Sequence, residues 1–539
     1  MRQSKAEHNS MRDSFARQSK KTVDREAAEI NHAKFESKFE SGFESGSEPL
    51  PASASPANSS VRVAGRRLPG YRWLGWRAMA AVLGGIVLRL WMLTAFPQVS
   101  GDALIYGGIA KNILLHGQFA ITDGSGVIHP TLIRLPGYPL FLAACFRVFG
   151  VANYSAVAYL QIVLELAACL LLADFVRRIA SPRAGLNALW LAAMCPFTAV
   201  YSSAPLTESP TFDMICLALW SLERYLAGSR PAPLNSETTE CRKTNWAFLG
   251  LFTLAISGAA LLRPDGALLA FALWPALILS QNRRKKLTRP VLAKTMLVGV
   301  VSVLPFTAWT VRNWQAFHVF EPLAPRYAND PGEDPHLGWQ HWVKTWCLDF
   351  TCTSEVYWNA PDGPIAVDDL PDWAFDSDAQ HEQIFELFED YNRDQDLTPE
   401  IDARFAALAR ERTKTHPIRT WLLLPLGRLA DMTFRPRVEN LPIDLRWWEY
   451  SQHHPETDFS WIYGAVNLLF LGLGIAGLLY RPRYWPYMAA YLVLRCLLLL
   501  TIEAPETRYT LEFFPVLFAT GGIALQRIFS RQPRTASVA

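Results

Sequence analysis

The sequence predicts an all-α protein that spans a membrane about ten times. Half of the residues, 50%, are hydrophobic and only 19% are charged, a balance that favours a membrane protein over a set of soluble domains. The hydrophobic residues also recur in stretches close to the roughly 20 residues that cross a bilayer. Short charged loops separate these stretches, so a simple soluble globular protein is excluded.

Lysines and arginines of the short loops give the expected topology. Such residues lie mainly on the cytoplasmic side, and clusters such as 177–183 and 283–289 all fall on one side if the chain crosses ten times. Both termini then face the cytoplasm of a bacterial-type inner or plasma membrane. The expected spans are residues 78–97, 152–175, 185–204, 208–226, 246–262, 266–281, 291–311, 460–480, 484–502 and 509–528.

Composition divides the chain into five parts. The N-terminal part is rich in Ser, Glu and Lys and lacks the hydrophobic content needed for folding, so we expect a disordered tail. The segment after the seventh span contains far more acidic than basic residues, which makes it a poor binder of nucleic acid. The parts are a cytoplasmic tail (1–75), a transmembrane module (76–311) with its first outer loop (98–151), an extracytoplasmic segment (312–459), C-terminal transmembrane helices (460–528) and a second tail (529–539).

The first outer loop begins with an amphipathic helix of about four turns. Within "GDALIYGGIAKNILLHGQF", Ile105, Ile109 and Ile113 recur every four residues, which is the spacing of one helix face. Asp102 stands at the start of this helix. An aspartate there can cap the helix and favour its positive end, or it can carry chemistry, and the pattern leaves both readings open.

Further helices are expected to lie in the membrane interface or outside it. "HPTLIRLPGYPLFLAACFRVFG", 129–150, is apolar, but counting it as a span would place flanking residues on the wrong sides, so we expect an interfacial helix. Residues 416–434 form a second such helix, and 380–412 an amphipathic helix or pair. Four tryptophans of this region could stack on sugars or lie in the interface: Trp339, Trp342, Trp346 and Trp358.

The polar residues of the spans bear on the class of function. An ion-coupled transporter usually needs carboxylates or histidines inside the membrane, and Glu165 is the only clear carboxylate in the middle of a span. A transporter or flippase for a lipid-linked or polar solute is therefore the weaker alternative. The polar residues that could carry chemistry lie instead at the outer boundary of the membrane.

The order of residues there resembles the GT-C glycosyltransferases. The nearest relatives would be the polyprenyl-phosphate-sugar transferases grouped with bacterial protein O-mannosyltransferases and the lipid A aminoarabinose transferase. The shared features are an outer loop with Asp, then Tyr, "AKN", "HGQF" and "RLPGYPLF", and more loosely "RPDGALLAFAL" and "APETRYTLEFFPVL". The resemblance implies an inverting sugar transfer from a polyprenyl-phosphate donor to an extracytoplasmic protein, lipid or glycan.

The resemblance also implies roles for individual residues. The acid of the first outer loop acts as general base in such enzymes, and Asp102 matches that position. Many members carry Asp-Glu there, whereas Ala103 follows Asp102. Glu208 resembles a second acidic position and could contact the acceptor or a divalent metal ion, or it could simply begin a helix.

The departing phosphate needs cations, for which we favour Arg134, Arg263 and Arg508. Arginines at the ends of spans can also extend to lipid headgroups without a catalytic role. Tyr106 and Tyr138 are expected to line the substrate cavity.

Two cysteines lie in the extracytoplasmic segment, where an oxidising compartment permits a disulfide. Cys347 and Cys352 are separated by four residues, and only a suitable turn brings such a pair together. The sequence leaves open whether they are bonded.

Overall fold

The structure is a computed structural model that describes residues 75–530 with the exception of 97, 98, 100, 229–237, 280–288, 362, 450, 451 and 453. The two expected tails, 1–75 and 529–539, lie outside the described residues apart from their innermost positions. The fold is all-α, as predicted. The described residues contain one small sheet, in which β1 (Ala120–Thr122) pairs antiparallel with β2 (Ile128–Pro130), with Ile121 opposite His129.

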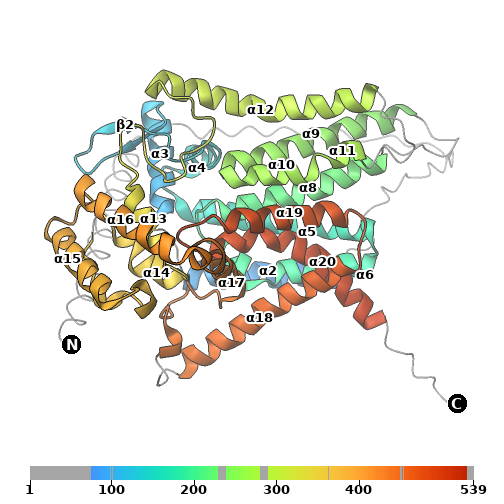
Figure 1. The fold of residues 1–539 in the computed structure, drawn as a ribbon. Coiled ribbons are helices and arrows are strands. Elements are labelled where there is room, and N and C mark those ends of the chain that lie inside the picture. The colour runs from blue at the N-terminus through green and yellow to red at the C-terminus, as the bar shows by residue number, and fades with distance from the viewer. Residues whose placement is uncertain are drawn as a thin grey trace, which may run out of the picture. The chain divides into compact units, whose positions relative to one another are not determined.

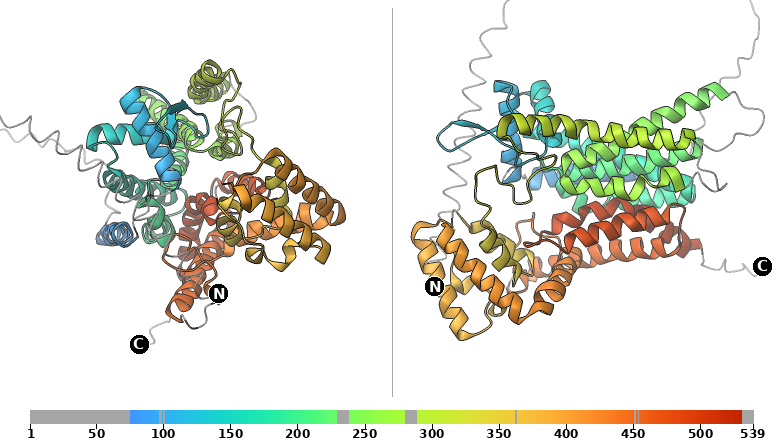
Figure 2. Two further views of the ribbon diagram at one scale, coloured as in Figure 1. Left: turned by 90° about the vertical axis from the view of Figure 1, so that its left-hand side faces the viewer. Right: turned by 45° about the horizontal axis from the view of Figure 1, so that its top comes forward.

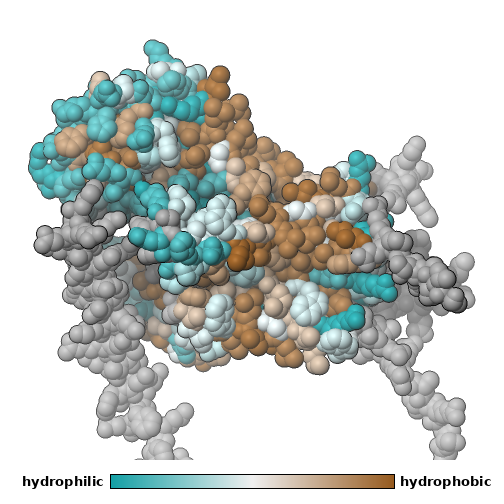
Figure 3. All heavy atoms as spheres, turned by 90° about the horizontal axis from the view of Figure 1, so that it is seen from below, coloured by the Kyte–Doolittle hydropathy of each residue, from teal (hydrophilic) through white to brown (hydrophobic). Residues whose placement is uncertain are grey.

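Long helices lying side by side form the body of the protein (Figures 1 and 2). They are α2 (Trp76–Ala95), α5 (Tyr154–Ile179), α6 (Pro182–Ala193), α8 (Glu208–Gly228), α9 (Thr238–Leu262), α12 (Arg289–Phe317), α18 (His454–Leu479), α19 (Trp485–Leu499) and α20 (Phe514–Ser530). Their exposed sides are largely hydrophobic, as the brown surface in Figure 3 shows. Such a surface is suited to lipid.

Helices occupy all ten expected spans, but they differ in length. Six described helices are individually long and apolar enough to cross a membrane, or seven if α6 and α7 (Pro196–Ser202), which meet at 56°, count as one broken span. The expected span 266–281 is divided into α10 (Ala267–Leu273) and α11 (Ala276–Leu279), and α19 has only 15 residues. The count of ten therefore remains a prediction.

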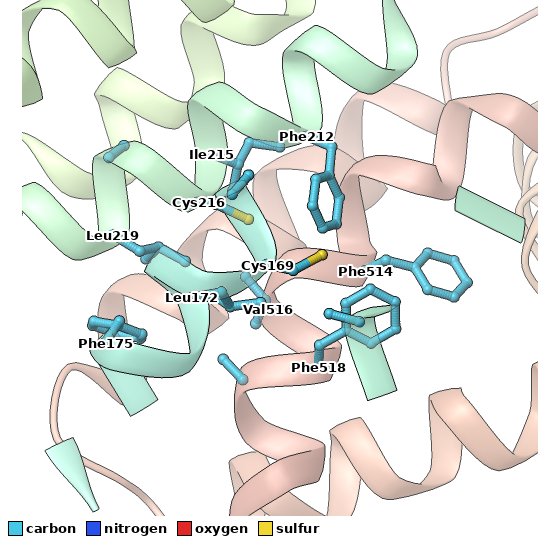
Figure 4. Packing of buried hydrophobic residues seen from close by; sticks show 14 of the residues in the cluster. Cys169, Leu172, Phe175, Phe212, Ile215, Cys216, Leu219, Phe514, Val516 and Phe518 are labelled. Carbon is cyan, nitrogen blue, oxygen red and sulfur yellow. The ribbon is translucent and has the colours of Figure 1, made fainter. Parts of the chain in front are cut away.

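The core of the bundle lies between α5, α8 and α20. Figure 4 shows side chains of these helices packed together. Close approach of the backbones depends on glycine: a Cβ on Gly477 of α18 would lie 1.8 Å from the carbonyl oxygen of Thr520 in α20. Thr520 donates its hydroxyl to the Gly474 carbonyl at 2.7 Å. Small residues at such contacts are typical of helix packing in membranes.

The predicted helices of the first outer loop are present. α3 (Asp102–His116) ends at Gly117, whose φ of 67° is left-handed, and α4 (Gly137–Phe149) begins after Pro136 and ends at Gly150. Both run across the direction of the long helices (Figures 1 and 2). Each helix thus ends at a glycine, which is common at helix C-termini.

The segment between α12 and α18 contains its own hydrophobic core. Its helices are α13 (Leu337–Lys344), α14 (Phe350–Glu355), α15 (Asp378–Asp394), α16 (Pro399–Thr415), a π-helical turn (Arg419–Leu423) and α17 (Leu424–Phe434). The expected amphipathic pair is present as α15 and α16. Trp339, Trp342 and Trp346 are buried in this core, so they neither stack on sugars nor lie in a membrane interface. Trp358 is half exposed, and Cys347 and Cys352 are disulfide-bonded with their Cα atoms 5.7 Å apart.

Candidate active site

Asp102 is the first residue of α3, and its side chain turns away from its own helix. The N-cap is Gly101, with φ of 53°, and no side chain caps the helix. One oxygen of Asp102, Oδ1, accepts a hydrogen bond of 2.7 Å from Nη2 of Arg134, and Oδ2 lies 2.9 Å from Nη1 of Arg508. The carboxylate therefore binds two guanidinium groups and does not cap the helix.

These two arginines reach Asp102 from distant parts of the chain. Arg134 lies in the turn before α4, donates to the Ile133 carbonyl and stands over the ring of Tyr106 at 5.8 Å. Arg508 lies in η8 (Thr507–Phe513), the 3₁₀ turn that leads into α20. Burial raises the pKa of Asp102, but the positive charges of Arg508 and Arg134 outweigh it and hold that pKa below its ordinary value. Asp102 is thus ionised at neutral pH.

Glu208 connects this group to a third arginine. It is the first residue of α8, and its Oε1 lies 2.9 Å from Nη1 of Arg263 and 3.8 Å from Nη1 of Arg508. Arg263 follows α9 directly and precedes η1 (Pro264–Gly266). The structure thus brings together all five charged residues singled out in the sequence, Asp102, Arg134, Glu208, Arg263 and Arg508. We call them, with the partners described next, the ion-pair network.

Four further charged residues belong to the network and were missed in the sequence. Asp265 and Glu512 each lie 3.2 Å from Nε of Arg263. The same two acids contact the fully buried Arg495 of α19, at 2.7 and 2.6 Å. Glu506 lies 2.6 Å from Nε of Arg508. A signal was available, because three of the four occur within "RPDG" and "PETRYTLE" beside the arginines already noted, and Arg495 interrupts a hydrophobic helix.

Aromatic rings separate and orient the arginines. The Tyr509 ring has Arg263 at 5.6 Å and Arg508 at 5.7 Å from its centre, and its hydroxyl donates to Glu506. Tyr106 and Tyr138 meet edge to face at 5.1 Å. Tyr138 is fully buried and donates its hydroxyl to Gln161 at 2.7 Å, so it packs behind Tyr106. Its expected place in a substrate cavity remains a prediction.

Contacts with the segment between α12 and α18 hold the loop that carries η8. Glu503 lies 2.8 Å from Arg326 and 3.1 Å from Lys344. Arg428 of α17, fully buried, donates to the Cys347 carbonyl at 2.7 Å and to the Ile502 carbonyl at 3.3 Å. Arg437 donates to the Thr507 carbonyl at 2.8 Å. Arg508 is therefore positioned by the segment between α12 and α18 as well as by α20.

Comparison with known proteins bears on what the network does. Residues 129–309 match the family model described as dolichyl-phosphate-mannose-protein mannosyltransferase. The matched region makes up about a third of the chain, and this region is similar to that family. The matched region contains Arg134, Glu208 and Arg263, whereas Asp102 and Arg508 lie on either side of it. No curated protein matches this sequence.

Several solved structures are similar to this chain at low sequence identity. The Archaeoglobus fulgidus oligosaccharyltransferase tethered with an acceptor peptide has 12% identity and a TM-score of 0.47, with 85% of this chain and 50% of that chain covered. The chain thus spans about half the length of that protein. ArnT from Cupriavidus metallidurans bound to undecaprenyl phosphate has 14% identity and a TM-score of 0.36, with 84% and 79% covered.

A divalent metal ion was expected from the sequence as an optional cofactor. Among the described residues, no group of three or more His, Cys, Asp or Glu side chains is placed to hold one. Glu208, the acid considered for this role, has Arg263 and Arg508 as its charged neighbours. Guanidinium groups at these distances repel a cation, so the residues as arranged do not fit a metal ion.

Proposed function

We propose that the protein transfers a sugar from a polyprenyl-phosphate carrier to an acceptor hydroxyl, with inversion and with Asp102 as general base. The observation that carries the proposal is the contact of one carboxylate, Asp102, with two arginines that belong to a larger arginine cluster. The name of the matching family, which includes a lipid-phosphate-linked mannose and a protein acceptor, supports the donor class. Of these features, we propose for this chain only the donor class, a sugar carried on a lipid phosphate.

The chemistry requires a base on one side of the sugar and positive charge on the other. The acceptor oxygen forms a bond to the anomeric carbon while the bond from that carbon to the phosphate oxygen breaks. The acceptor proton passes to a carboxylate oxygen of Asp102, and the electron pair of the broken bond leaves with the phosphate. Attack from the face opposite the leaving group inverts the configuration.

The arginines serve the leaving group. A guanidinium presents its N–H donors in a fork that matches phosphate oxygens. Arg134, Arg263 and Arg508 would bind the donor phosphate and stabilise the charge that develops on it. Glu208, whose Oε1 lies 2.9 Å from Arg263 and 3.8 Å from Arg508, would hold these two arginines in place or contact the acceptor.

The proposed orientation follows from the loops. The arginine-rich short loops at the other end of the bundle would face the cytoplasm, with both termini. The ion-pair network and the segment between α12 and α18 would then lie on the extracytoplasmic side of an inner or plasma membrane. The partners would be the lipid-linked donor, a protein, lipid or glycan acceptor and the surrounding membrane lipids.

The alternative, a transporter or flippase, would need ionisable groups free to change partners inside the membrane. Glu165 offers no such freedom: its Oε1 lies 2.6 Å from Arg89 and its Oε2 accepts from Ser209 at 2.9 Å. Both side chains of the pair are almost completely buried. This arrangement favours the enzyme.

The experiment follows a radiolabelled sugar out of the polyprenyl-phosphate pool, with the full chain reconstituted in acceptor-containing membranes from cells that lack the protein. We expect Asp102→Asn to lower transfer by roughly a hundred- to ten-thousandfold, the range of a lost general base. The unfolding temperature should fall only slightly, because a partly exposed ion pair contributes little to stability.

The matched control is Asp123→Asn. Asp123 lies in the same loop but is exposed and bonds to Ser125 and His129 outside the network. The Asp123→Asn variant should transfer at the wild-type rate. Transfer by Asp102→Asn at the wild-type rate would rule out the base assignment. If the wild type transfers no sugar from any lipid phosphate, the proposed reaction is ruled out.

A further inference from the structure

Both oxygens of the proposed base are occupied by arginines. Oδ1 of Asp102 lies 2.7 Å from Arg134, and Oδ2 lies 2.9 Å from Arg508. A carboxylate held in this way points at guanidinium groups and not at an acceptor hydroxyl. The same two charges make it a weak base, because they stabilise its ionised form. Release from one of these arginines would make Asp102 a stronger base and free an oxygen for an acceptor hydroxyl.

The arginines that hold Asp102 are also those that a phosphate would use. Carboxylates and phosphates bind guanidinium through the same N–H donors, often two at a time. Arg134 has no other acid among its ion pairs in the described part of the chain. For a phosphate to bind Arg134 through the face that Asp102 occupies, the carboxylate has to leave.

Exposure indicates which acid would leave Arg508. Three acids contact it: Asp102 at 2.9 Å, Glu506 at 2.6 Å and Glu208 at 3.8 Å. The Asp102 side chain is 24% exposed, whereas those of Glu506 and Glu208 are 7% and 3% exposed. Glu506 also accepts a hydrogen bond from the Tyr509 hydroxyl. Asp102 is thus the most exposed of the three acids and the one that an incoming anion reaches first.

We propose that Asp102 and the donor phosphate compete for Arg134 and Arg508, so that binding of the lipid phosphate releases the carboxylate to serve as the base. This inference rests on the proposed function and adds a regulation of the same site. The exchange replaces one anion by another, which keeps the arginines neutralised throughout. It also makes the base available only when a donor is present. The acceptor hydroxyl is then not deprotonated before a sugar is bound.

Competition makes an unusual prediction for Asp102→Asn. Removal of an anion that competes for the same arginines raises the affinity of the site for a phosphate. We expect the variant, as the full chain in nanodiscs, to bind farnesyl phosphate roughly tenfold more tightly than the wild type at neutral pH. Isothermal titration measures this difference. Farnesol, which lacks the phosphate, should bind both proteins equally.

The controls separate this inference from the proposed function. Asp123→Asn removes the same charge from an exposed site with its own partners and should bind farnesyl phosphate as the wild type does. If the wild type binds the phosphate and Asp102→Asn binds it equally or more weakly, the competition is overturned while the donor assignment stands. If the wild type binds no lipid phosphate, both are overturned. Asp102→Ser, which also removes the carboxylate, provides the same comparison should the Asn variant not fold.

Discussion

Two sets of ion-paired arginine and carboxylate side chains in this protein are alike in composition but differ in their surroundings. Arg89 and Glu165, inside the bundle, form a single pair at 2.6 Å in which each side chain is at most 1% exposed. Nη1 of Arg89 also donates to the Ala193 carbonyl at 2.6 Å and to the Gly85 carbonyl at 3.3 Å. In the ion-pair network, Asp102, Arg134 and Arg508 are 20 to 24% exposed and share partners. A closed pair holds helices together, whereas an open and shared one can exchange partners with a ligand.

The largest expected effect concerns the closed pair. Arg89→Met would leave Glu165 buried without its partner, which typically destabilises by about 3–5 kcal/mol. Thermal unfolding of the purified protein should show this loss. The double variant Arg89→Met with Glu165→Leu should recover most of the stability, because no uncompensated charge remains. Equal losses in the single and double variants would mean that Arg89 acts through packing and not through its charge.

The next effect concerns the open network. Arg508→Lys keeps one positive charge but loses the fork of N–H donors that binds Asp102 and would bind a phosphate. We expect sugar transfer to fall by about a hundredfold, as when one donor to a developing anion is lost, with little change in unfolding temperature. Arg393→Lys is the control, since Arg393 is 71% exposed on α15. A stability loss as large as that of Arg89→Met would place Arg508 with the structural pair.

A third effect tests the close packing that positions η8 and α20. Gly477→Ala would place a Cβ 1.8 Å from the Thr520 carbonyl oxygen, so α18 and α20 must move apart. We expect a loss of about 1–3 kcal/mol in stability. Gly472, on the same helix, has nothing within 4 Å of a Cβ, so Gly472→Ala should be neutral or slightly stabilising. Similar behaviour of the two variants would show that α18 and α20 are not in contact at Gly477.

The smallest effect is the pH dependence of Asp102. Its pKa lies below the ordinary value of 3.8 in the folded protein, so its ion pairs stabilise the fold above that value. This contribution is lost only as the pH falls through the lowered pKa. The stability difference between wild type and Asp102→Asn should therefore stay constant from about pH 8 to about pH 5. A difference that changes within this range would mean that Arg134 and Arg508 do not hold the carboxylate in solution.

Much of the fold was predictable because its signals are local. An apolar repeat that begins at Asp102 and the proline and glycine that flank α4 define helices within a few residues. The hydrophobic core between α12 and α18 was not predictable in this way. Trp339 and Trp342 could have faced lipid, sugar or protein, and only the packing of α13 against α16 decides that they are buried. The number of spans stays open because short helices such as α19 carry the same composition as long ones.

The site was predictable in its members but not in its contacts. Arg508 and Asp102 are far apart in the sequence, and their contact depends on how η8 is held by α20 and by Arg437. Arg495 is visible in the sequence as an interruption of a hydrophobic helix, but the sequence does not show which acids it contacts. Its partners, Asp265 and Glu512, come from two other elements, and only tertiary packing brings them to it.

The most direct test of the account is to measure sugar transfer and farnesyl phosphate binding on the same preparation of Asp102→Asn. The account predicts almost no transfer together with affinity roughly tenfold above that of the wild type. Such a pairing requires that one carboxylate be both the base and a competitor of the phosphate. Transfer at the wild-type rate, whatever the affinity, would contradict the account.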